Sequence, residues 1–312
     1  MNKLLAILLL ALTFAACTND EPSPSPTPVP SVNEENNQGE EEKDDDKDAD
    51  SSFVMPDTLR ILLIGNSFAQ DAVDHFLKNL LDCDKRKYVI GRLHYPSCSF
   101  AMHLDYATKD EAVYNFLCYD SDGKSESFAN YTMSQAIAGA DWNLISYQQA
   151  SEFSGQYDSY VQYLPLLIEE MDKHFGKGHH KIFHQTWAFD SYYDGTKFKP
   201  YEYDQLKMYE AIADASSKTI QNFGFNLLVP NGTAVQNMRT VAGHENMTKD
   251  GCHLSEYLGW YLASCTWYEA LTGNDVRKLT YRPSQITAED ARLAREAAHA
   301  AVLEPYKVTT IE

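Results

Sequence analysis

Short apolar runs alternate with amphipathic stretches from Leu59 onward. The first run, Leu59–Ile64, is almost continuously apolar and stops at Gly65, which is typical of a strand buried on both faces. Later runs of the same character are each followed by a loop or a helix-like stretch. We predict further strands at Tyr88–Leu93, Trp142–Tyr147, Lys181–Trp187 and Asn226–Val229.

Helical spacing of apolar residues predicts the helices between and after these strands. They cover Ala69–Leu81, Tyr157–His174, Tyr203–Phe223, Ser255–Leu271 and Thr287–Leu303. Ser255 and Thr287 are suitable N-caps, and Asp290 follows Thr287 at capping-box spacing. This alternation predicts an α/β fold, a three-layer sandwich in which helices cover both faces of a parallel five-stranded sheet.

One stretch departs from the alternation. Val113–Tyr131 carries the turn sequence Ser121-Asp122-Gly123-Lys124 at its middle and is predicted to be a β-hairpin insertion. No linker interrupts residues 53–312, which are numerous enough for one α/β domain with a full core.

The first 17 residues have the layout of a signal peptide. A basic start precedes the apolar run Leu4–Phe14, and the small residues Ala15 and Ala16 stand before Cys17. This order resembles a bacterial lipobox, in which the cysteine is lipidated; an ordinary signal peptide cut nearby is the alternative. We therefore expect an exported protein, anchored through Cys17 to the cell envelope, on the outer membrane with its domain facing the periplasm or the surface.

Residues 18–52 are rich in Pro and Ser and then acidic, with almost nothing apolar to bury, and are predicted to be a disordered tether. The net charge of the chain is −19, of which this segment carries twelve acidic and two basic residues. The remaining domain is still acidic, which argues against nucleic acid as a partner and favours neutral ligands.

Cysteine and histidine do not predict a metal site. The five cysteines after Cys17 include no CxxC pair, and they allow at most two disulfides. His179, His180 and His184 have no carboxylate at ligand spacing, and His184 falls in a predicted strand. We expect no metal and no cofactor.

Ser67 stands where a nucleophile could act, directly after the first strand in Gly65-Asn66-Ser67-Phe68. At a helix N-terminus, free backbone amides and the helix dipole can stabilise an oxyanion. A serine that merely caps the helix is the alternative.

A histidine with an upstream acid follows near the end of the chain, in Asp250-Gly251-Cys252-His253. The Asp250 carboxylate can orient the His253 ring and leave its other nitrogen for Ser67. Asp-x-x-His also arises by chance, so its position before a helix is what favours the catalytic interpretation.

These blocks resemble the SGNH/GDSL hydrolases, whose first block is a strand followed by Gly-Asp-Ser and whose last is Asp-x-x-His before the C-terminal helix. Ile64–Phe68, Tyr147–Ser151 and Asp250–Leu254 together look like an uncharacterised branch of exported bacterial lipoproteins in that superfamily. The resemblance implies a flavodoxin-like SGNH hydrolase fold and a triad of Ser67, His253 and Asp250.

The oxyanion hole implied by the resemblance is altered here. The Ser67 amide is retained, but the family's glycine after the second strand is absent, and Ser97 or Cys98 would supply that N–H. The family's asparagine is replaced by glutamines, and we assign its role to Gln149, with Gln148 and Ser151 as alternatives. Glutamines that close a loop by hydrogen bonds are an equally good interpretation.

Substrate contacts are assigned to Gln148 and to Trp187, which opens an aromatic stretch that includes Phe189, Tyr192 and Tyr193 and could line a sugar site. Core packing is the alternative for Trp187. Cys252 is too near His253 in sequence to serve as the nucleophile. Three further residues could lie near the pocket by loop position: His103, Arg239 and His244.

The sequence therefore predicts a serine ester hydrolase, an O-acyl or O-acetyl esterase that acts on carbohydrate, with a glycan ester or other small ester as its partner. The alternative class is a non-catalytic glycan-binding lipoprotein, which a serine-directed fluorophosphonate would not label. A structural scaffold with chance motifs would place Ser67 and His253 far apart.

Overall fold

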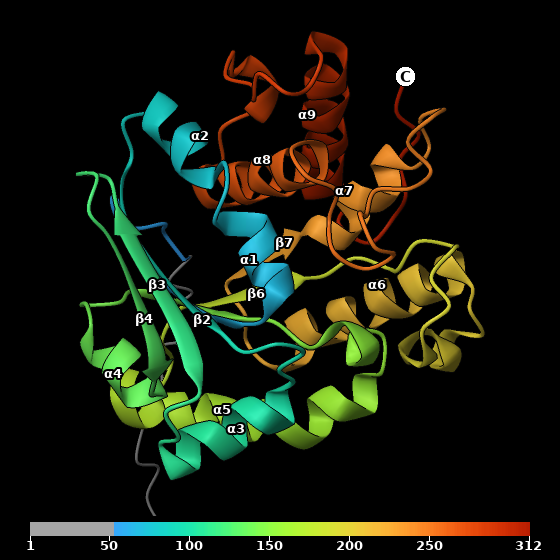
Figure 1. Cartoon of the computed structure of the whole chain (residues 1–312). Coiled ribbons are helices and arrows are strands. Elements are labelled where there is room, and N and C mark those ends of the chain that lie inside the picture. Colours follow the sequence, from blue (N-terminus) through green and yellow to red (C-terminus); the bar gives the residue numbers. More distant parts are fainter. Residues whose placement is uncertain (1–52) are drawn as a thin grey trace, which may run out of the picture. The chain divides into compact units, whose positions relative to one another are not determined.

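A mixed seven-stranded sheet lies at the centre of residues 53–312, the part of the chain that the computed structural model describes (Figure 1). The strands run β4-β3-β2-β1-β5-β6-β7 across the sheet. Their bounds are β1 Thr58–Gly65, β2 Lys87–His94, β3 Tyr114–Asp120, β4 Ser125–Tyr131, β5 Leu144–Tyr147, β6 Lys181–Gln185 and β7 Leu227–Pro230. The predictions of a signal peptide, of lipidation at Cys17 and of a tether over 18–52 lie outside these residues.

The predicted sheet was wrong in its extent. The five predicted strands are present and pair in parallel, but β3 and β4 extend the sheet, so that it is seven-stranded and mixed rather than five-stranded and parallel. The β-hairpin at Val113–Tyr131 forms as predicted, and β3 pairs antiparallel with β2 from Val89↔Asp120 to His94↔Asn115. Without the hairpin, β2 would be an edge strand with unpaired backbone N–H and C=O groups. Pairing with β3 satisfies these groups.

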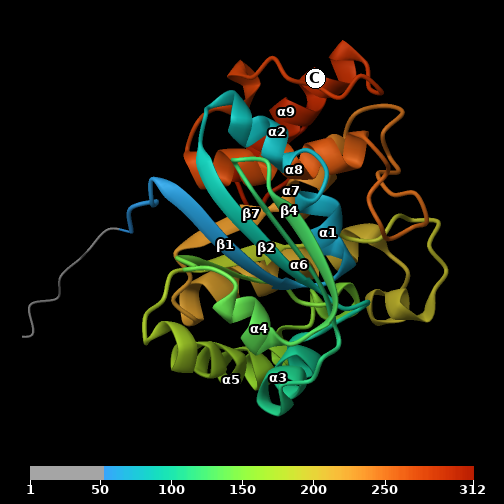
Figure 2. The ribbon, with the colours of Figure 1, turned by 60° about the vertical axis from the view of Figure 1, so that its left-hand side comes forward.

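Helices cover both faces of the sheet (Figure 2). One face packs against α1, α2, α7, α8 and α9, and the other against α3, α4 and α5. The bounds are α1 Ser67–Val73, α2 Leu77–Cys83, α3 Phe100–Lys109, α4 Met133–Ala138, α5 Tyr157–Phe175, α6 Gln205–Asn222, α7 Asn231–Met238, α8 Leu258–Thr272 and α9 Ala288–Leu303, with 3-10 turns η1 Ser151–Phe153, η2 Thr196–Tyr201 and η3 Val276–Lys278.

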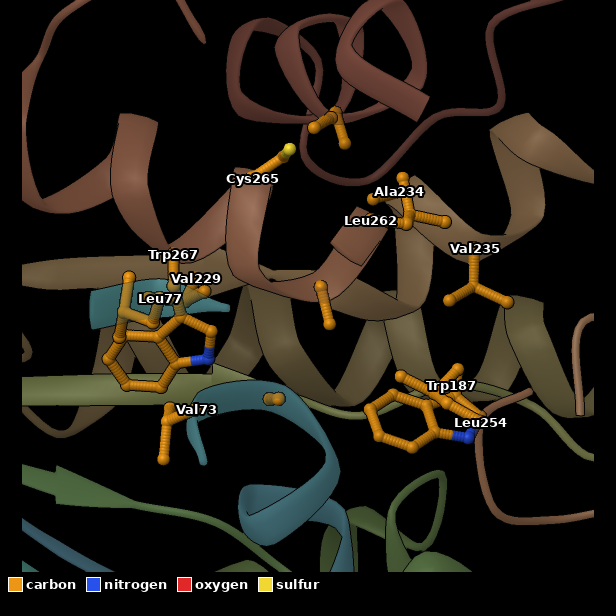
Figure 3. Packing of buried hydrophobic residues seen from close by; sticks show 14 of the residues in the cluster. Val73, Leu77, Trp187, Val229, Ala234, Val235, Leu254, Leu262, Cys265 and Trp267 are labelled. Atoms are coloured by element: carbon orange, nitrogen blue, oxygen red, sulfur yellow. The ribbon is translucent and has the colours of Figure 1, made fainter. Parts of the chain in front are cut away.

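Strand β1 shows why the apolar run is nearly continuous. Leu59, Ile61 and Leu63 point into the cluster under α1 and α8, whereas Leu62 and Ile64 point to the opposite face. Alternate side chains of a strand lie on opposite faces, so a strand covered on both sides needs apolar residues at every position. Figure 3 shows part of the first cluster, including Trp187 and Leu254.

Two predicted helices differ from those in the structure. The predicted helix Ala69–Leu81 is broken into α1 and α2, because the chain turns at Asp74, whose carboxylate forms a buried ion pair with Arg92 of β2 (2.8 Å). Ser255 is not the N-cap of α8, which begins at Leu258 after Tyr257, but its Oγ atom accepts a hydrogen bond from the Gly259 amide in the first turn (3.2 Å).

Thr287 caps α9 as predicted, in a capping box with Asp290. All five cysteines among the described residues are free thiols. None of the helices in this part of the chain is long and apolar enough to span a membrane.

Candidate active site

Ser67 is the first residue of α1, directly after the turn that follows β1. Gly65 lies so close to Gln148 that a Cβ there would sit 2.7 Å from the Gln148 Oε1 atom, which explains the glycine. Asn66 is the N-cap, and its Oδ1 atom accepts a hydrogen bond from the Phe68 amide (2.9 Å). The Ser67 side chain is thereby held at the carboxyl end of β1, where ligands bind in open α/β sheets.

His253 lies between Ser67 and Asp250, although 186 positions separate it from the serine. Its Nε2 atom is 2.9 Å from Ser67 Oγ, and its Nδ1 atom is 2.7 Å from Asp250 Oδ2. Serine, imidazole and carboxylate therefore form one hydrogen-bonded series, the geometry of a catalytic triad.

Asp250 is held in its ionised form. Partial burial alone would raise the pKa of its carboxyl, but hydrogen bonds from the His253 amide, the His253 ring and the Cys252 amide lower the pKa well below its ordinary value. A carboxylate that stays ionised can stabilise the imidazolium that forms when His253 accepts a proton.

A buried ion pair secures the loop that carries Asp250 and His253. Arg239 Nη2 contacts Asp190 Oδ1 at 2.5 Å, and their side chains are 3% and 0% exposed. Asp190 also accepts hydrogen bonds from the Met247 and Thr248 amides and from the Thr248 hydroxyl. Its own N–H donates to the Gly251 carbonyl (2.9 Å), so both ends of the turn are fixed.

A second acid, Asp71 of α1, lies under the same loop. Its carboxylate accepts a hydrogen bond from the amide of Leu254, the residue after His253 (2.9 Å), and another from Trp260 Nε1 (3.2 Å). Burial raises the pKa of Asp71 from 3.8 to about 6, and the Leu254 hydrogen bond and the nearby charge of His253 oppose this rise. Asp71 thus joins the nucleophile helix to the histidine loop.

Ionisation of Asp71 is expected to lower the stability of the fold. Because the folded state holds this proton more tightly than the unfolded chain, its contribution is complete below about pH 4 and is lost as pH rises through about 6. The free energy of unfolding of Asp71→Asn minus that of the wild type should therefore increase by on the order of 2–3 kcal/mol between pH 4 and pH 7. Urea unfolding at several pH values, with the exposed Asp141→Asn as control, measures this, and parallel curves would contradict it.

A cavity of about 150 Å³ opens at Ser67 and His253. Its walls come from loops that follow β1, β2, β5 and β6 and from the histidine loop. They are formed by Asn66, Ser67, Phe68, Ser97, Ser151, Phe189, Tyr193, Lys197, Cys252 and His253.

Two backbone amides of residues at the cavity have no hydrogen-bond partner in residues 53–312. Within the described residues, the N–H groups of Ser67 and Ser97 donate no hydrogen bond. Both residues line the cavity, so the structure brings these two predicted donors together. Ser151, one of the alternatives to Gln149, also lines it.

Gln149 does not take the role assigned to it. Its Nε2 atom donates to Ser159 Oγ (3.0 Å), and its Oε1 atom accepts from the Phe100 and Ala150 amides. Gln149 is buried and is not among the residues of the Ser67 cavity. The loop-closing alternative describes this glutamine, because its amide is committed to joining the loop to α3 and α5.

The two predicted substrate contacts, Gln148 and Trp187, are also wrong. Gln148 is 1% exposed and binds the Asn66 and Ala69 amides, so it shapes the turn at the nucleophile. Trp187 is fully buried, stacks on Phe68 with ring centroids 4.3 Å apart, and donates to the Cys252 carbonyl. Both side chains lie outside the Ser67 cavity and contact residues that line it.

The other residues singled out in the sequence have varied places. Phe189 and Tyr193 line the cavity, whereas Tyr192 is exposed and hydrogen-bonded to Thr248. His103 is buried against Tyr114, and His244 pairs with Asp290 at 3.2 Å. Lys197 was missed, since nothing near it in the sequence forms a motif.

Two groups of side chains in the described residues bring possible metal-ligand atoms within 4.8 Å of one another. The first is Asp250, Cys252 and His253, and the second is Glu269, Asp275 and His299. In the first group, burial raises the pKa of Cys252 to about 12, and Asp250 and His253 are hydrogen-bonded to each other. In the second, Arg277 occupies the Asp275 carboxylate. His179 and His184 hydrogen-bond to different partners, Asp172 and Asn231.

Residues 60–301 match the model of a family described as a domain of unknown function, DUF4886. The chain is 39% identical to a DUF4886 family protein from Bacteroides uniformis ATCC 8492 of known crystal structure, with a TM-score of 0.78; the match covers 81% of this chain and 98% of that one. No curated protein matches significantly.

Two weaker likenesses have TM-scores below 0.5. A candidate SGNH hydrolase from Slackia heliotrinireducens is 18% identical, with a TM-score of 0.47 and coverage of 69% of this chain and 99% of that one. TesA is 12% identical, with a TM-score of 0.44 and coverage of 69% and 98%. The chemistry of the site therefore rests on its own residues.

Proposed function

The chain belongs to the DUF4886 family, and from its site we propose that it is a serine ester hydrolase with Ser67 as nucleophile, His253 as general base and Asp250 as the orienting acid. The observation that carries the proposal is the unbroken hydrogen-bonded series from Ser67 Oγ through the His253 ring to Asp250. Such a series lowers the cost of removing the serine proton during attack.

The reaction would proceed in two halves. Ser67 Oγ attacks the ester carbonyl carbon and passes its proton to His253, and the carbonyl electron pair moves to oxygen, facing the Ser67 and Ser97 amides. When the oxyanion collapses, the ester C–O bond breaks and the alcohol leaves with the proton from His253. Water, deprotonated by His253, then releases the acid and restores the serine.

We propose a short acyl group, with a carbohydrate as the alcohol. The cavity of about 150 Å³ is well below the roughly 300–1,000 Å³ usual for drug-sized ligands, which favours an acetyl group over a long chain. The half-buried aromatic ring of Tyr193 at its wall suits the face of a sugar. Export and anchoring through Cys17 remain part of the proposal and would place the enzyme where glycans are exposed.

The two competing interpretations fare differently. A scaffold with chance motifs requires Ser67 and His253 to lie far apart, and their 2.9 Å contact contradicts it. A non-catalytic glycan-binding protein would leave the serine, histidine and aspartate series without a use. We therefore favour the hydrolase.

Acyl-chain selectivity tests the proposed substrate. The small cavity predicts that kcat/KM for p-nitrophenyl acetate exceeds that for p-nitrophenyl octanoate by at least about tenfold, a difference of roughly 1.4 kcal/mol in transition-state binding. Release of acetate from acetylated xylo-oligosaccharides is the matching test of the alcohol. Equal or reversed rates for the two esters would contradict the short acyl group, and an absence of hydrolysis of any ester would contradict the enzyme.

A further inference from the structure

The turn after β2 holds Ser97 in an unusual conformation. The Cys98 amide donates to the Tyr95 carbonyl (3.2 Å), which closes a four-residue turn with Pro96 and Ser97 at its centre. Ser97 has a φ of 54°, in the left-handed region. Turns with proline at the second position and a positive φ at the third ordinarily carry glycine or asparagine there, because other side chains are strained.

A lysine from a distant segment contacts this serine. Lys197 of η2 places its Nζ atom 2.8 Å from Ser97 Oγ and 2.9 Å from Glu152 Oε1 of η1. The Lys197 side chain is 40% exposed and that of Glu152 is 16% exposed. Three loops, which follow β2, β5 and β6, are thus joined at the mouth of the cavity.

The contact acts on a residue that lines the cavity. The Ser97 hydroxyl is fixed by the lysine, the Ser97 carbonyl side of the turn by the Cys98 hydrogen bond, and the Ser97 N–H remains without a partner among the described residues. Cys98 is in turn held to the nucleophile turn, since its carbonyl accepts from Asn66 Nδ2 (3.2 Å). Lys197 and Glu152 therefore complete a frame around one predicted oxyanion donor.

We propose that Lys197 is a positioning residue for the oxyanion hole: with Glu152 it clamps the Ser97 side chain and keeps Ser97 in the left-handed conformation that presents its N–H to the reacting carbonyl oxygen. This inference rests on the proposed hydrolase function. A glycine at position 97 would adopt the same φ without a clamp, which gives the inference a distinctive test.

The test combines Lys197→Met with Ser97→Gly in the full-length protein, assayed with p-nitrophenyl acetate. Loss of an oxyanion donor costs about 100- to 1000-fold in kcat, so a misplaced donor in Lys197→Met should cost about 10- to 100-fold with KM changed by less than about threefold. Ser97→Gly alone keeps the backbone N–H but removes the partner of the lysine, and it supplies the reference kcat for the double variant. The double variant should recover to the level of Ser97→Gly, because its donor no longer needs the lysine.

Each outcome decides the matter. A Lys197→Met variant with wild-type kcat overturns the clamp. A double variant slower than Ser97→Gly by the factor that separates Lys197→Met from the wild type also overturns it, and would mean that the lysine charge acts on the reaction directly. Urea unfolding of all three variants separates a loss of fold from a loss of positioning. A wild-type protein without Ser67-dependent hydrolysis removes the proposed function, and the inference with it, whereas an active wild type with an indifferent lysine removes the inference alone.

Discussion

Alanine at Ser67 or at His253 is expected to lower kcat for p-nitrophenyl acetate by about 10⁴- to 10⁶-fold, since each change removes a group that bonds or moves a proton in the transition state. The two losses should be nearly equal and should not add in the double variant. The reason is the 2.9 Å contact between the two side chains, which makes them one functional unit.

Asp250→Ala should cost less, about 10³- to 10⁴-fold, because the carboxylate orients and stabilises the imidazole without touching the reacting atoms. Matched controls are Thr287→Ala, which removes another hydroxyl at a helix start, and His174→Ala at an exposed position. Steady-state kinetics of these six variants, the double variant included, measures these effects. Losses that multiply in the double variant, or a Ser67→Ala variant within tenfold of the wild type, would contradict the triad.

The largest effect on stability is expected at Arg239. Arg239→Met leaves the fully buried Asp190 carboxylate without its cation, and breaking such a pair typically costs about 3–5 kcal/mol. The carboxylate also holds the Met247 and Thr248 amides, so the loop that carries Asp250 and His253 should loosen as well.

Urea unfolding gives the loss of free energy directly, and the exposed pair Arg292 and Glu289 supplies the control. Their side chains are 43% and 63% exposed, and Arg292→Met should leave the free energy of unfolding almost unchanged. If Arg239→Met were as stable as Arg292→Met, the ion pair would not be what fixes the histidine loop.

Local pattern predicted most of the elements. The apolar run at Leu59–Ile64 could be assigned to a buried strand because both of its faces are covered, and Thr287 could be assigned as a cap because its partner Asp290 lies three residues away. Features that depend on contacts distant in the sequence were missed: the β-hairpin extends the sheet by pairing with β2, and the break after α1 occurs where Asp74 binds Arg92.

The residues of the candidate site also fall into those that local pattern predicts and those that depend on distant contacts. Ser67, Asp250 and His253 could be proposed because each lies in a short block whose position beside a strand or a helix is readable. Gln149 was misassigned because the residue type does not show where its side chain points, and its amide donates to Ser159. Lys197 carries no motif and reaches Ser97 across 100 positions, so only the folded chain brings the two together.

The account is tested most directly by treating the full-length protein with a fluorophosphonate and mapping the adduct by peptide mass spectrometry. We predict a single adduct on Ser67, formed rapidly by the wild type, lost in Ser67→Ala and slowed at least about 100-fold in His253→Ala, because the probe reacts with a serine only when a base activates it. An adduct on another residue, or a wild type that does not label, would contradict the claim that Ser67 is an activated nucleophile.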